Sequence, residues 1–285
     1  MNSGYIKITR PVNSLFAGFA VLLGIIIAKG TVPGVSPAEY LILIPVVAMI
    51  TAAGNVINDY YDRDIDAVNR PERPIPSGSV SPKGALVYSI VLFILGIALS
   101  FFTGYLCLII AAVNSLLLVL YALKLKGIPF AGNISVSYLS ASIFLFGGAL
   151  YGLPGLINNF PVALITFFAI LSREILKDAE DVEGDKAGGA KTLPMYTGIY
   201  RSSLLAFIFA LIAVIISLMP LFRWWGVYYI ILILIADALI MAGAVKGVMS
   251  GDDSGALKRS GATGILKKGM FLAVVIFIVS ALLLG

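Results

Sequence analysis

The chain alternates long uncharged stretches with short polar segments. A helix needs about 20 mostly apolar residues to cross a membrane, and the uncharged stretches approach or exceed that length. Two of them, 84–123 and 127–172, are long enough for two helices each. We divide them near Thr103-Gly104 and at 153–161, where Gly and Pro indicate turns. The pattern predicts nine transmembrane helices, at about 12–29, 38–57, 84–102, 105–123, 133–151, 161–177, 202–221, 225–245 and 268–284.

Composition supports a membrane protein. Of the 285 residues, 60% are hydrophobic and 12% are charged, about half the charged fraction of soluble domains. We therefore predict an all-α polytopic membrane protein. The segment 1–285 is expected to form a single domain, because no polar linker is long enough to separate two. Cys107 is the one cysteine, so an internal disulfide is excluded. The chain has no histidine, which removes the usual general base and the commonest metal ligand.

The distribution of positive charge predicts the orientation. If the N-terminus lies in the cytoplasm, the 20 lysines and arginines all fall on the cytoplasmic side except Lys29 and Arg223. Such a bias is typical of cytoplasmic loops in membrane proteins. We therefore expect a multi-pass protein of the cell membrane, with its N-terminus and its active site on the cytoplasmic side. The net charge of +5 reflects this topology, so we expect no nucleic-acid partner.

A first acidic cluster follows the second predicted helix, in "NVINDYYDRDIDAVNRPERPIPSG" (55–78). If the helix continues into this segment, Asn58, Asp62 and Asp66 lie at i, i+4 and i+8, on one helical face. Asp59 lies one residue off that stripe. Two arginines, Arg70 and Arg73, follow, and each precedes a proline.

A second acidic cluster follows the sixth predicted helix, in "REILKDAEDVEGDKAGGAKTLP" (173–194). Asp178, Asp181 and Asp185 lie at i, i+3 and i+7, again on one face, and Glu174 extends the stripe backward. The surrounding bases are Lys177, Lys186 and Lys191.

Carboxylates this close repel one another unless a cation lies between them. Oxygen ligands without His or Cys suit Mg²⁺, which keeps coordination positions for substrate phosphates. Neighbouring Arg and Lys side chains also complement phosphate oxygens. Solvated surface charge would explain one such cluster, but two clusters with helical Asp spacing favour a site. We therefore predict that the two clusters bind a diphosphate through Mg²⁺ and that the apolar helices hold its lipid tail.

These residues resemble the UbiA superfamily of intramembrane prenyltransferases. The family pattern N-D-x-x-D-x-x-x-D stands here as 58–66, and the pattern D-x-x-D-x-x-x-D stands as 178–185. The resemblance covers nearly the whole chain and implies a prenyl transfer that depends on Mg²⁺ and releases diphosphate. It implies that Asn58, Asp62, Asp181 and Asp185 bind the metal, with Asp66 and Asp178 as catalytic residues close by.

The remaining site residues come from flanking segments. The segment "TRPVN" (9–13) resembles the N-terminal motif of the superfamily, and "YALKLKG" (121–127) resembles its Tyr-and-Lys segment, with either Lys124 or Lys126 as the functional lysine. As further catalytic residues we expect Arg73, Lys124 and Lys177, which would stabilise charge on the leaving diphosphate. As substrate-binding residues we expect Arg10, Asn13, Arg70, Tyr121, Lys126 and Lys191.

Within the superfamily, 69–78 and 177–194 most resemble archaeal members that add a geranylgeranyl chain to geranylgeranylglyceryl phosphate, a step of ether lipid synthesis. This resemblance implies geranylgeranyl diphosphate as donor, a lipid-like acceptor, contact with membrane lipids and no obligatory protein partner. An aromatic acceptor, such as a quinone precursor, is the main alternative. A cation transporter is less favoured, because transport sites usually lie near the membrane midplane. The D-G-x-x-A-R pattern of CDP-alcohol phosphotransferases is missing.

Several polar residues inside or between the helices have a simpler explanation. Asn114 and Asn133 are expected to form hydrogen bonds between helices, although Asn133 also suits the edge of the polar pocket. Asp237 is expected to bond a neighbouring helix or to carry a proton, with a role in the site as the alternative. The Gly-rich segment 247–264 is expected to be a mobile, solvated loop, with a role in covering the site as the alternative.

Overall fold

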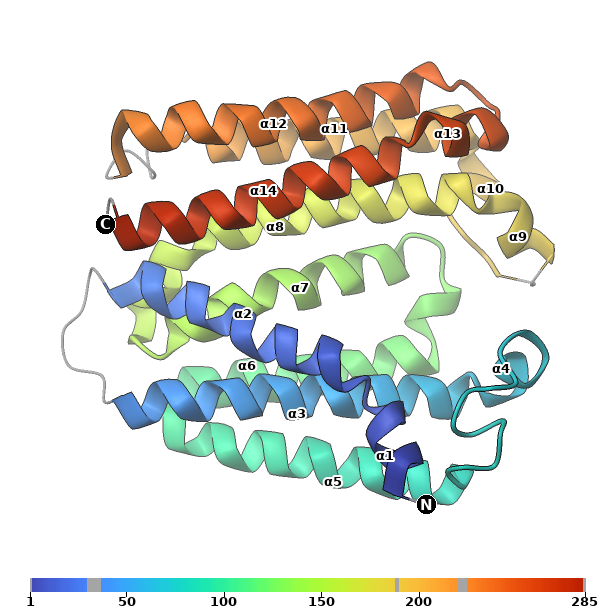
Figure 1. The fold of residues 1–285 in the computed structure, drawn as a ribbon, viewed down its shortest axis with the longest axis vertical. Coiled ribbons are helices and arrows are strands. Elements are labelled where there is room, and N and C mark those ends of the chain that lie inside the picture. The colour runs from blue at the N-terminus through green and yellow to red at the C-terminus, as the bar shows by residue number, and fades with distance from the viewer. Residues whose placement is uncertain (1, 30–36, 188–189, 220–224, 284–285) are drawn as a thin grey trace. The chain divides into compact units, whose positions relative to one another are not determined.

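In the computed structural model, the regular elements of the described residues are all helices (Figure 1). The structure describes residues 2–29, 37–187, 190–219 and 225–283. The long helices are α2 (Pro11–Lys29), α3 (Pro37–Tyr61), α5 (Pro82–Ser100), α6 (Tyr105–Leu123), α7 (Ala131–Ala149), α8 (Gly152–Glu180), α11 (Ile199–Ser217), α12 (Gly226–Met249) and α14 (Ala262–Leu283). The short helices are α1 (Asn2–Ile8), α4 (Arg63–Asn69), α9 (Val182–Ala187), α10 (Pro194–Thr197) and α13 (Ser254–Ser260), with single 3₁₀ turns at Phe101–Thr103 and Leu125–Gly127.

A long helix stands at each of the nine predicted places. Within the described residues, eight of these helices are long and apolar enough to cross a membrane. The helix outside that set is α7, because its first half, "GNISVSYLSAS", is rich in small polar residues. The all-α membrane fold is therefore confirmed, whereas the count of nine spans stays a prediction.

The boundaries of α8 differ from the prediction. We expected a turn at 153–161, but α8 begins at Gly152 and continues through Pro161 to Glu180. The chain turns earlier, at Gly152, whose positive φ of 72° suits glycine. Pro154 lies in the first helical turn, where its missing N–H is not needed. Reading every proline as a break was wrong here, since the helix carries Pro161 in its interior.

The chain divides into two compact units. Unit 1 contains residues 1–124 and 142–159, and unit 2 contains residues 125–141 and 160–285. Helices α7 and α8 contribute residues to both units. The division leaves the prediction of a single domain untested.

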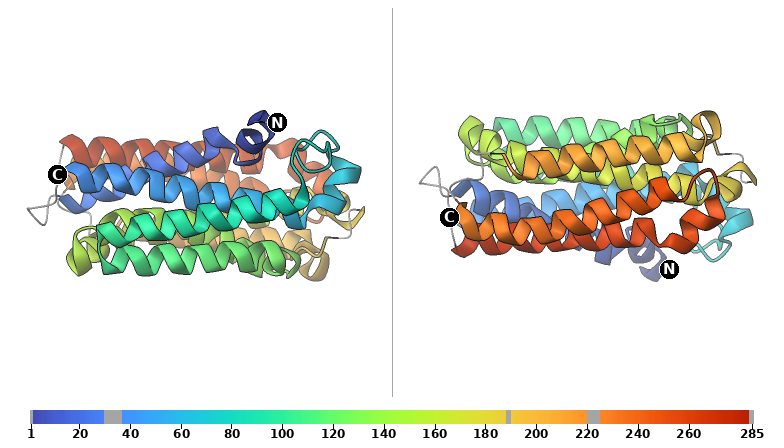
Figure 2. Two further views of the ribbon diagram at one scale, coloured as in Figure 1. Left: turned by 90° about the horizontal axis from the view of Figure 1, so that it is seen from below. Right: turned by 90° about the horizontal axis from the view of Figure 1, so that it is seen from above.

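The core of unit 1 forms around α3, which runs beside α5 in both figures (Figures 1 and 2). Its buried residues recur every three or four positions, as one face of a helix requires. They are Leu43, Val46, Ile50, Ala53 and Ile57.

Close approach of α2 and α7 in unit 1 depends on glycine. A Cβ added to Gly24 would lie 2.5 Å from the carbonyl oxygen of Phe144, and one added to Gly147 would lie 2.5 Å from that of Val21. Small residues of this kind let membrane helices pack closely.

Unit 2 is built in the same manner around α12, which lies beside α14 and α11 (Figures 1 and 2). A Cβ added to Gly243 would lie 2.8 Å from the carbonyl oxygen of Ala262.

The hydroxyl of Ser217 donates a 2.7 Å hydrogen bond to Asp237, which joins α11 to α12. The amide of Asn114 likewise donates to the hydroxyl of Ser142, in unit 1. Both bonds confirm the predicted hydrogen bonding between helices.

Candidate active site

The first acidic motif occupies the end of α3 and the start of α4. Helix α3 ends at Tyr61, and Asp62 stands between the two helices. Backbone hydrogen bonds nevertheless continue in helical register, from Asp62 N to Asn58 O (2.9 Å) and from Asp66 N to Asp62 O (2.8 Å). The predicted spacing of Asn58, Asp62 and Asp66 is therefore present in the backbone, despite the change of helix.

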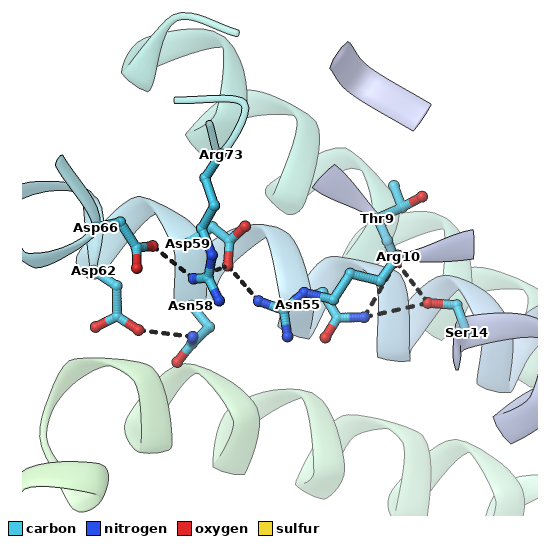
Figure 3. Close-up of polar contacts among 9 residues, drawn as sticks. All are labelled: Thr9, Arg10, Ser14, Asn55, Asn58, Asp59, Asp62, Asp66 and Arg73. Atoms are coloured by element: carbon cyan, nitrogen blue, oxygen red, sulfur yellow. Dashed lines mark hydrogen bonds and ion pairs between the residues drawn. The ribbon is translucent and has the colours of Figure 1, made fainter. Parts of the chain in front are cut away.

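The side chains of the predicted stripe do not act as one group. The amide of Asn58 donates a 2.8 Å hydrogen bond to Oδ2 of Asp62. Asp66 is buried and accepts instead from Arg73, across 2.6 Å. The stripe thus separates into an amide–carboxylate pair, Asn58 and Asp62, and an ion pair between Asp66 and Arg73 (Figure 3).

Asp59 connects this ion pair to the N-terminal segment. Its Oδ1 accepts from Nη2 of Arg10 (2.6 Å) and from Nη1 of Arg73 (3.2 Å). The side chains of Asp59 and Asp66 are 6% and 7% exposed, so two buried carboxylates face two arginines. A buried carboxylate requires a compensating cation. Arg10, Asp59, Arg73 and Asp66 therefore form one charge-balanced chain of ion pairs, drawn in Figure 3.

The backbone at Arg10 is held in a rare conformation. Arg10 has a φ of 49°, in the left-handed region that non-glycine residues seldom adopt. It precedes Pro11, which disfavours the right-handed helical conformation. The corner is tied down beside it, because the carbonyl oxygen of Thr9 accepts hydrogen bonds from Asn55 (3.1 Å) and from Ser14 (2.8 Å). The α1–α2 corner is thus bound to α3 at two adjacent points, Asn55 and Asp59.

The second acidic motif has the same local geometry in unit 2. Helix α8 ends at Glu180, Asp181 stands between two helices, and the short α9 follows. Helical hydrogen bonds again run through the break, from Asp181 N to Lys177 O (3.0 Å) and from Asp185 N to Asp181 O (2.9 Å). Each unit therefore contains a long apolar helix, a break at an aspartate and a short helix that carries a further aspartate.

Asn133 fixes one carboxylate of the second motif. Its amide lies on α7 and donates a 2.8 Å hydrogen bond to Oδ2 of Asp178. Asn133 is buried, with 9% of its surface exposed. Its expected place at the edge of a polar site is consistent with this contact.

Burial and a neighbouring acid disfavour the ionised form of Asp185. Burial raises the pKa of its carboxyl above the usual value, and the nearby charge of Asp181 raises the pKa further. The positive charge of Lys177 opposes this shift. A cation bound beside Asp185 would relieve the same repulsion.

Helix α13 borders the second motif. Nζ of Lys258 lies 3.8 Å from Oδ1 of Asp181, and the hydroxyl of Thr263 donates to the carboxylate of Glu180. A pocket of about 250 Å³ lies here, lined by Glu180, Asp181, Glu183, Gly184, Ser254, Gly255 and Lys258. The expectation of a loop throughout 247–264 was wrong, because Ser254–Ser260 form helix α13, which Asp253 caps by accepting from Ala256 N.

The remaining predicted residues lie on several helices and in the segments that follow them. Arg70 ends α4 and is exposed, and Lys124 ends α6. The other residues of this group are Asn13 on α2, Tyr121 on α6, Lys126 in the turn after α6, Lys177 on α8 and Lys191 between α9 and α10. Their functions stay predictions.

Sequence reasoning missed Asp59 and Lys258 as site residues, and it gave Asn133 a place at the edge of the pocket only as an alternative. For Asp59 a signal was present, because it lies three residues after the buried Val56 and seven after the buried Ala52, on the inward face of α3. An acidic side chain on a buried helical face needs a cationic partner. Neither the partner of Asn133 nor that of Lys258 is readable from spacing, because both come from other helices.

The oxygen donors of the motifs suit a hard cation. Among the described residues, no group of three or more acidic side chains is already arranged around a metal position. Mg²⁺ is usually held by one or two carboxylates together with water and substrate phosphates, so a complete protein cage is not required. The pair Asn58 and Asp62 in unit 1 and the pair Asp181 and Asp185 in unit 2 fit that pattern.

Comparison with known proteins identifies the family. The model of the UbiA prenyltransferase family matches residues 17–275. The chain belongs to the UbiA prenyltransferase family. This UbiA protein is 48% identical to the digeranylgeranylglyceryl phosphate synthase of Methanoculleus marisnigri over 281 residues, which cover 99% of each chain.

Solved structures agree with the family assignment. A structure described as that of digeranylgeranylglyceryl phosphate synthase in membranes is 34% identical, covers 98% of both chains and has a TM-score of 0.88. A UbiA homologue from Archaeoglobus fulgidus bound to GPP and Mg²⁺ has a TM-score of 0.64 at 20% identity, over 95% of this chain and 99% of its own, and shows the shared fold.

Family membership settles the broad class. The predicted resemblance to UbiA prenyltransferases is confirmed, and so is the prediction of a prenyl-transferring enzyme rather than a transporter. The eight apolar helices agree with a membrane enzyme of this family.

Proposed function

We propose that this UbiA protein transfers a geranylgeranyl group from geranylgeranyl diphosphate to geranylgeranylglyceryl phosphate and so forms digeranylgeranylglyceryl phosphate. The observation that carries the proposal is the 48% identity to a digeranylgeranylglyceryl phosphate synthase across 99% of both chains. Identity at this level without length differences supports a shared acceptor as well as a shared donor. The product is a precursor of archaeal ether lipids.

The cofactor in this proposal is Mg²⁺. Support comes from the oxygen-only donors of both motifs and from the homologue bound to GPP and Mg²⁺. We propose Asn58, Asp62, Asp181 and Asp185 as its ligands. When bound, Mg²⁺ neutralises diphosphate charge and makes diphosphate a better leaving group.

The chain's own cations complete the polar site. Arg10 and Arg73 each use one terminal nitrogen for the acids that hold them, whereas a guanidinium has five N–H donors. Their other N–H groups are suited to donate hydrogen bonds to the oxygens of the diphosphate, and Lys177 and Lys124 add positive charge at helix ends. These groups would stabilise the negative charge that grows on the diphosphate as the bond to the prenyl carbon breaks.

Asp66 and Asp178, whose carboxylates accept hydrogen bonds from other side chains, have a different role from the metal ligands. Asp66 is bound by Arg73 and Asp178 by Asn133, so each is fixed in one orientation. We propose that Asp66 positions Arg73, and that Asp178 lines the site and is a candidate to accept the proton of the acceptor hydroxyl. The apolar helices exclude water from the allylic cation, which water would otherwise capture.

The orientation of the protein in the membrane is part of the same proposal. Most basic residues of the described chain lie in the N-terminal segment, in the α3–α5 and α6–α7 connections, and in the segments that follow α8 and α12, whereas Lys29 ends α2. The two acidic motifs follow α3 and α8. By the positive-inside rule these segments face the cytoplasm. The soluble diphosphate would therefore leave on the cytoplasmic side.

The acceptor is tested by a direct competition. The purified protein in lipid nanodiscs is incubated with Mg²⁺ and geranylgeranyl diphosphate, together with geranylgeranylglyceryl phosphate and 4-hydroxybenzoate at equal concentration, and products are separated by mass spectrometry. The expected product is digeranylgeranylglyceryl phosphate alone. Prenylation of the aromatic acid alone would overturn the acceptor and favour a quinone-precursor enzyme.

A further inference from the structure

We propose that Asp59 is a positioning residue whose carboxylate holds Arg10 and Arg73 together as a two-arginine binding group for the donor's diphosphate. The proposal rests on the proposed function, because it concerns how the same donor is bound. It adds a residue that the predicted metal and substrate ligands leave out.

The geometry places Asp59 between the two arginines. One oxygen, Oδ1, accepts from Nη2 of Arg10 at 2.6 Å and from Nη1 of Arg73 at 3.2 Å (Figure 3). Two guanidinium groups that share one acceptor atom repel each other, and a negatively charged acceptor offsets that repulsion. Asp59 is the acid that contacts both arginines, so its carboxylate lowers the cost of holding the two cations side by side.

In these ion pairs the arginine side chains are more exposed than the acids. The side chains of Asp66 and Asp59 are 7% and 6% exposed, that of Arg73 is 17% exposed, and that of Arg10 is 36% exposed. The acids thus form a buried base, and the arginines have the more accessible positions. Such an arrangement leaves guanidinium N–H groups available to donate to a phosphate.

The strained corner gives an independent reason for a functional role. Arg10 has a φ of 49°, which costs a non-glycine residue free energy relative to ordinary backbone. A corner that served only to connect α1 and α2 would not require an arginine in this conformation. Asn55 holds the adjacent Thr9 carbonyl in place, so α3 fixes both the backbone and the side chain of Arg10.

The test measures binding of inorganic pyrophosphate, which needs no acceptor and no turnover. Wild-type protein, Asp59→Asn and the control Asp64→Asn are purified in detergent with Mg²⁺, and pyrophosphate is titrated by calorimetry. Asp64 carries the same charge in the same segment, but its side chain is 86% exposed and pairs with Arg63. Asp59→Asn is expected to weaken pyrophosphate binding roughly 10- to 100-fold, since charge-assisted hydrogen bonds hold both arginines. The control is expected to bind within about twofold of wild type.

A second readout separates positioning from metal binding. The Mg²⁺ concentration that gives half-maximal pyrophosphate binding is expected to stay the same in Asp59→Asn and to rise in Asp62→Asn. If Asp59→Asn raises it as much as Asp62→Asn does, Asp59 is a metal ligand and the proposal is wrong. Pyrophosphate binding equal to that of the control would overturn it as well.

A double-mutant cycle tests whether Asp59 acts through arginine. Asp59→Asn is expected to weaken pyrophosphate binding several-fold less in an Arg10→Gln background than in wild type, because part of its effect is then already lost. The double variant removes one charge of each sign and leaves the Arg73–Asp66 pair, so we expect it to fold even if Asp59→Asn alone does not. Fully additive effects would overturn the proposal. If wild-type protein binds pyrophosphate but transfers no prenyl group to geranylgeranylglyceryl phosphate, that result contradicts the proposed function instead.

Discussion

Replacing Asn133 with alanine would remove the donor that fixes Asp178. The amide of Asn133 lies 2.8 Å from Oδ2 of that carboxylate, and Asn133 is 9% exposed. A hydrogen bond to a charged acceptor contributes about 1.5–3 kcal/mol to stability. We therefore expect Asn133→Ala to lower the free energy of unfolding by that amount and the melting temperature by about 3–12 °C.

Activity should fall more than stability alone explains. If the orientation of Asp178 matters for transfer, the loss of the same interaction in the transition state lowers kcat/KM by about tenfold or more at temperatures where the variant is folded. The assay combines thermal unfolding in detergent with prenyl transfer at 25 °C, using saturating Mg²⁺.

The matched control is Asn114→Ala. Its amide donates to a neutral hydroxyl, that of Ser142, at 2.9 Å. Hydrogen bonds of this kind between membrane helices average about 0.6 kcal/mol, so the melting temperature should fall by only about 1–2 °C and kcat/KM should not change. Equal losses of stability in the two variants, with full activity in both, would refute the reasoning that Asn133 serves the site through Asp178.

Three further predictions concern the metal, the lysine and the orientation. Asp62→Ala and Asp181→Ala should each lower prenyl transfer at least 100-fold while the protein still inserts into membranes. The control Asp64→Asn should retain activity. Full activity in both alanine variants would reject the assignment of Asp62 and Asp181 as metal ligands. Of Lys124→Gln and Lys126→Gln, one should raise KM for the prenyl diphosphate about tenfold and the other less than twofold, and equal small effects would exclude both. Asp64→Cys should react with an impermeant maleimide only in inside-out vesicles, because residue 64 is expected to face the cytoplasm. The native Cys107 is buried, so it should not contribute to the labelling. Labelling in right-side-out vesicles would reverse the orientation.

The helices and their polar ends were accessible from the sequence because hydrophobicity is a local property. Twenty apolar residues predict a helix wherever they occur, and a long helix stands at each of the nine predicted places. The error at Pro161 arose because proline disfavours a helix locally, while packing and the surrounding apolar run favoured its continuation. Likewise, α13 was missed because Gly and Asp are typical of loops, although Asp253 serves here as a helix cap.

The roles within the motifs were only partly predictable. Helical spacing correctly placed Asn58, Asp62 and Asp66 one turn apart, as their backbone hydrogen bonds confirm. Spacing did not reveal that Asp66 turns to Arg73 while Asp62 turns to Asn58. Asp59 was set aside as lying off the stripe, although its phase with Val56 indicated burial.

The sequence by itself determined the all-α class, the apolar helices, the charge bias of their ends and the two aspartate motifs at one-turn spacing. The tertiary structure alone decided which acids are held by protein donors. Asp59 meets Arg10 from 49 positions away, and Asp178 meets Asn133 from 45 positions away. The physical reason is that helical periodicity fixes the face on which a side chain lies, whereas its partner depends on how distant helices pack against that face.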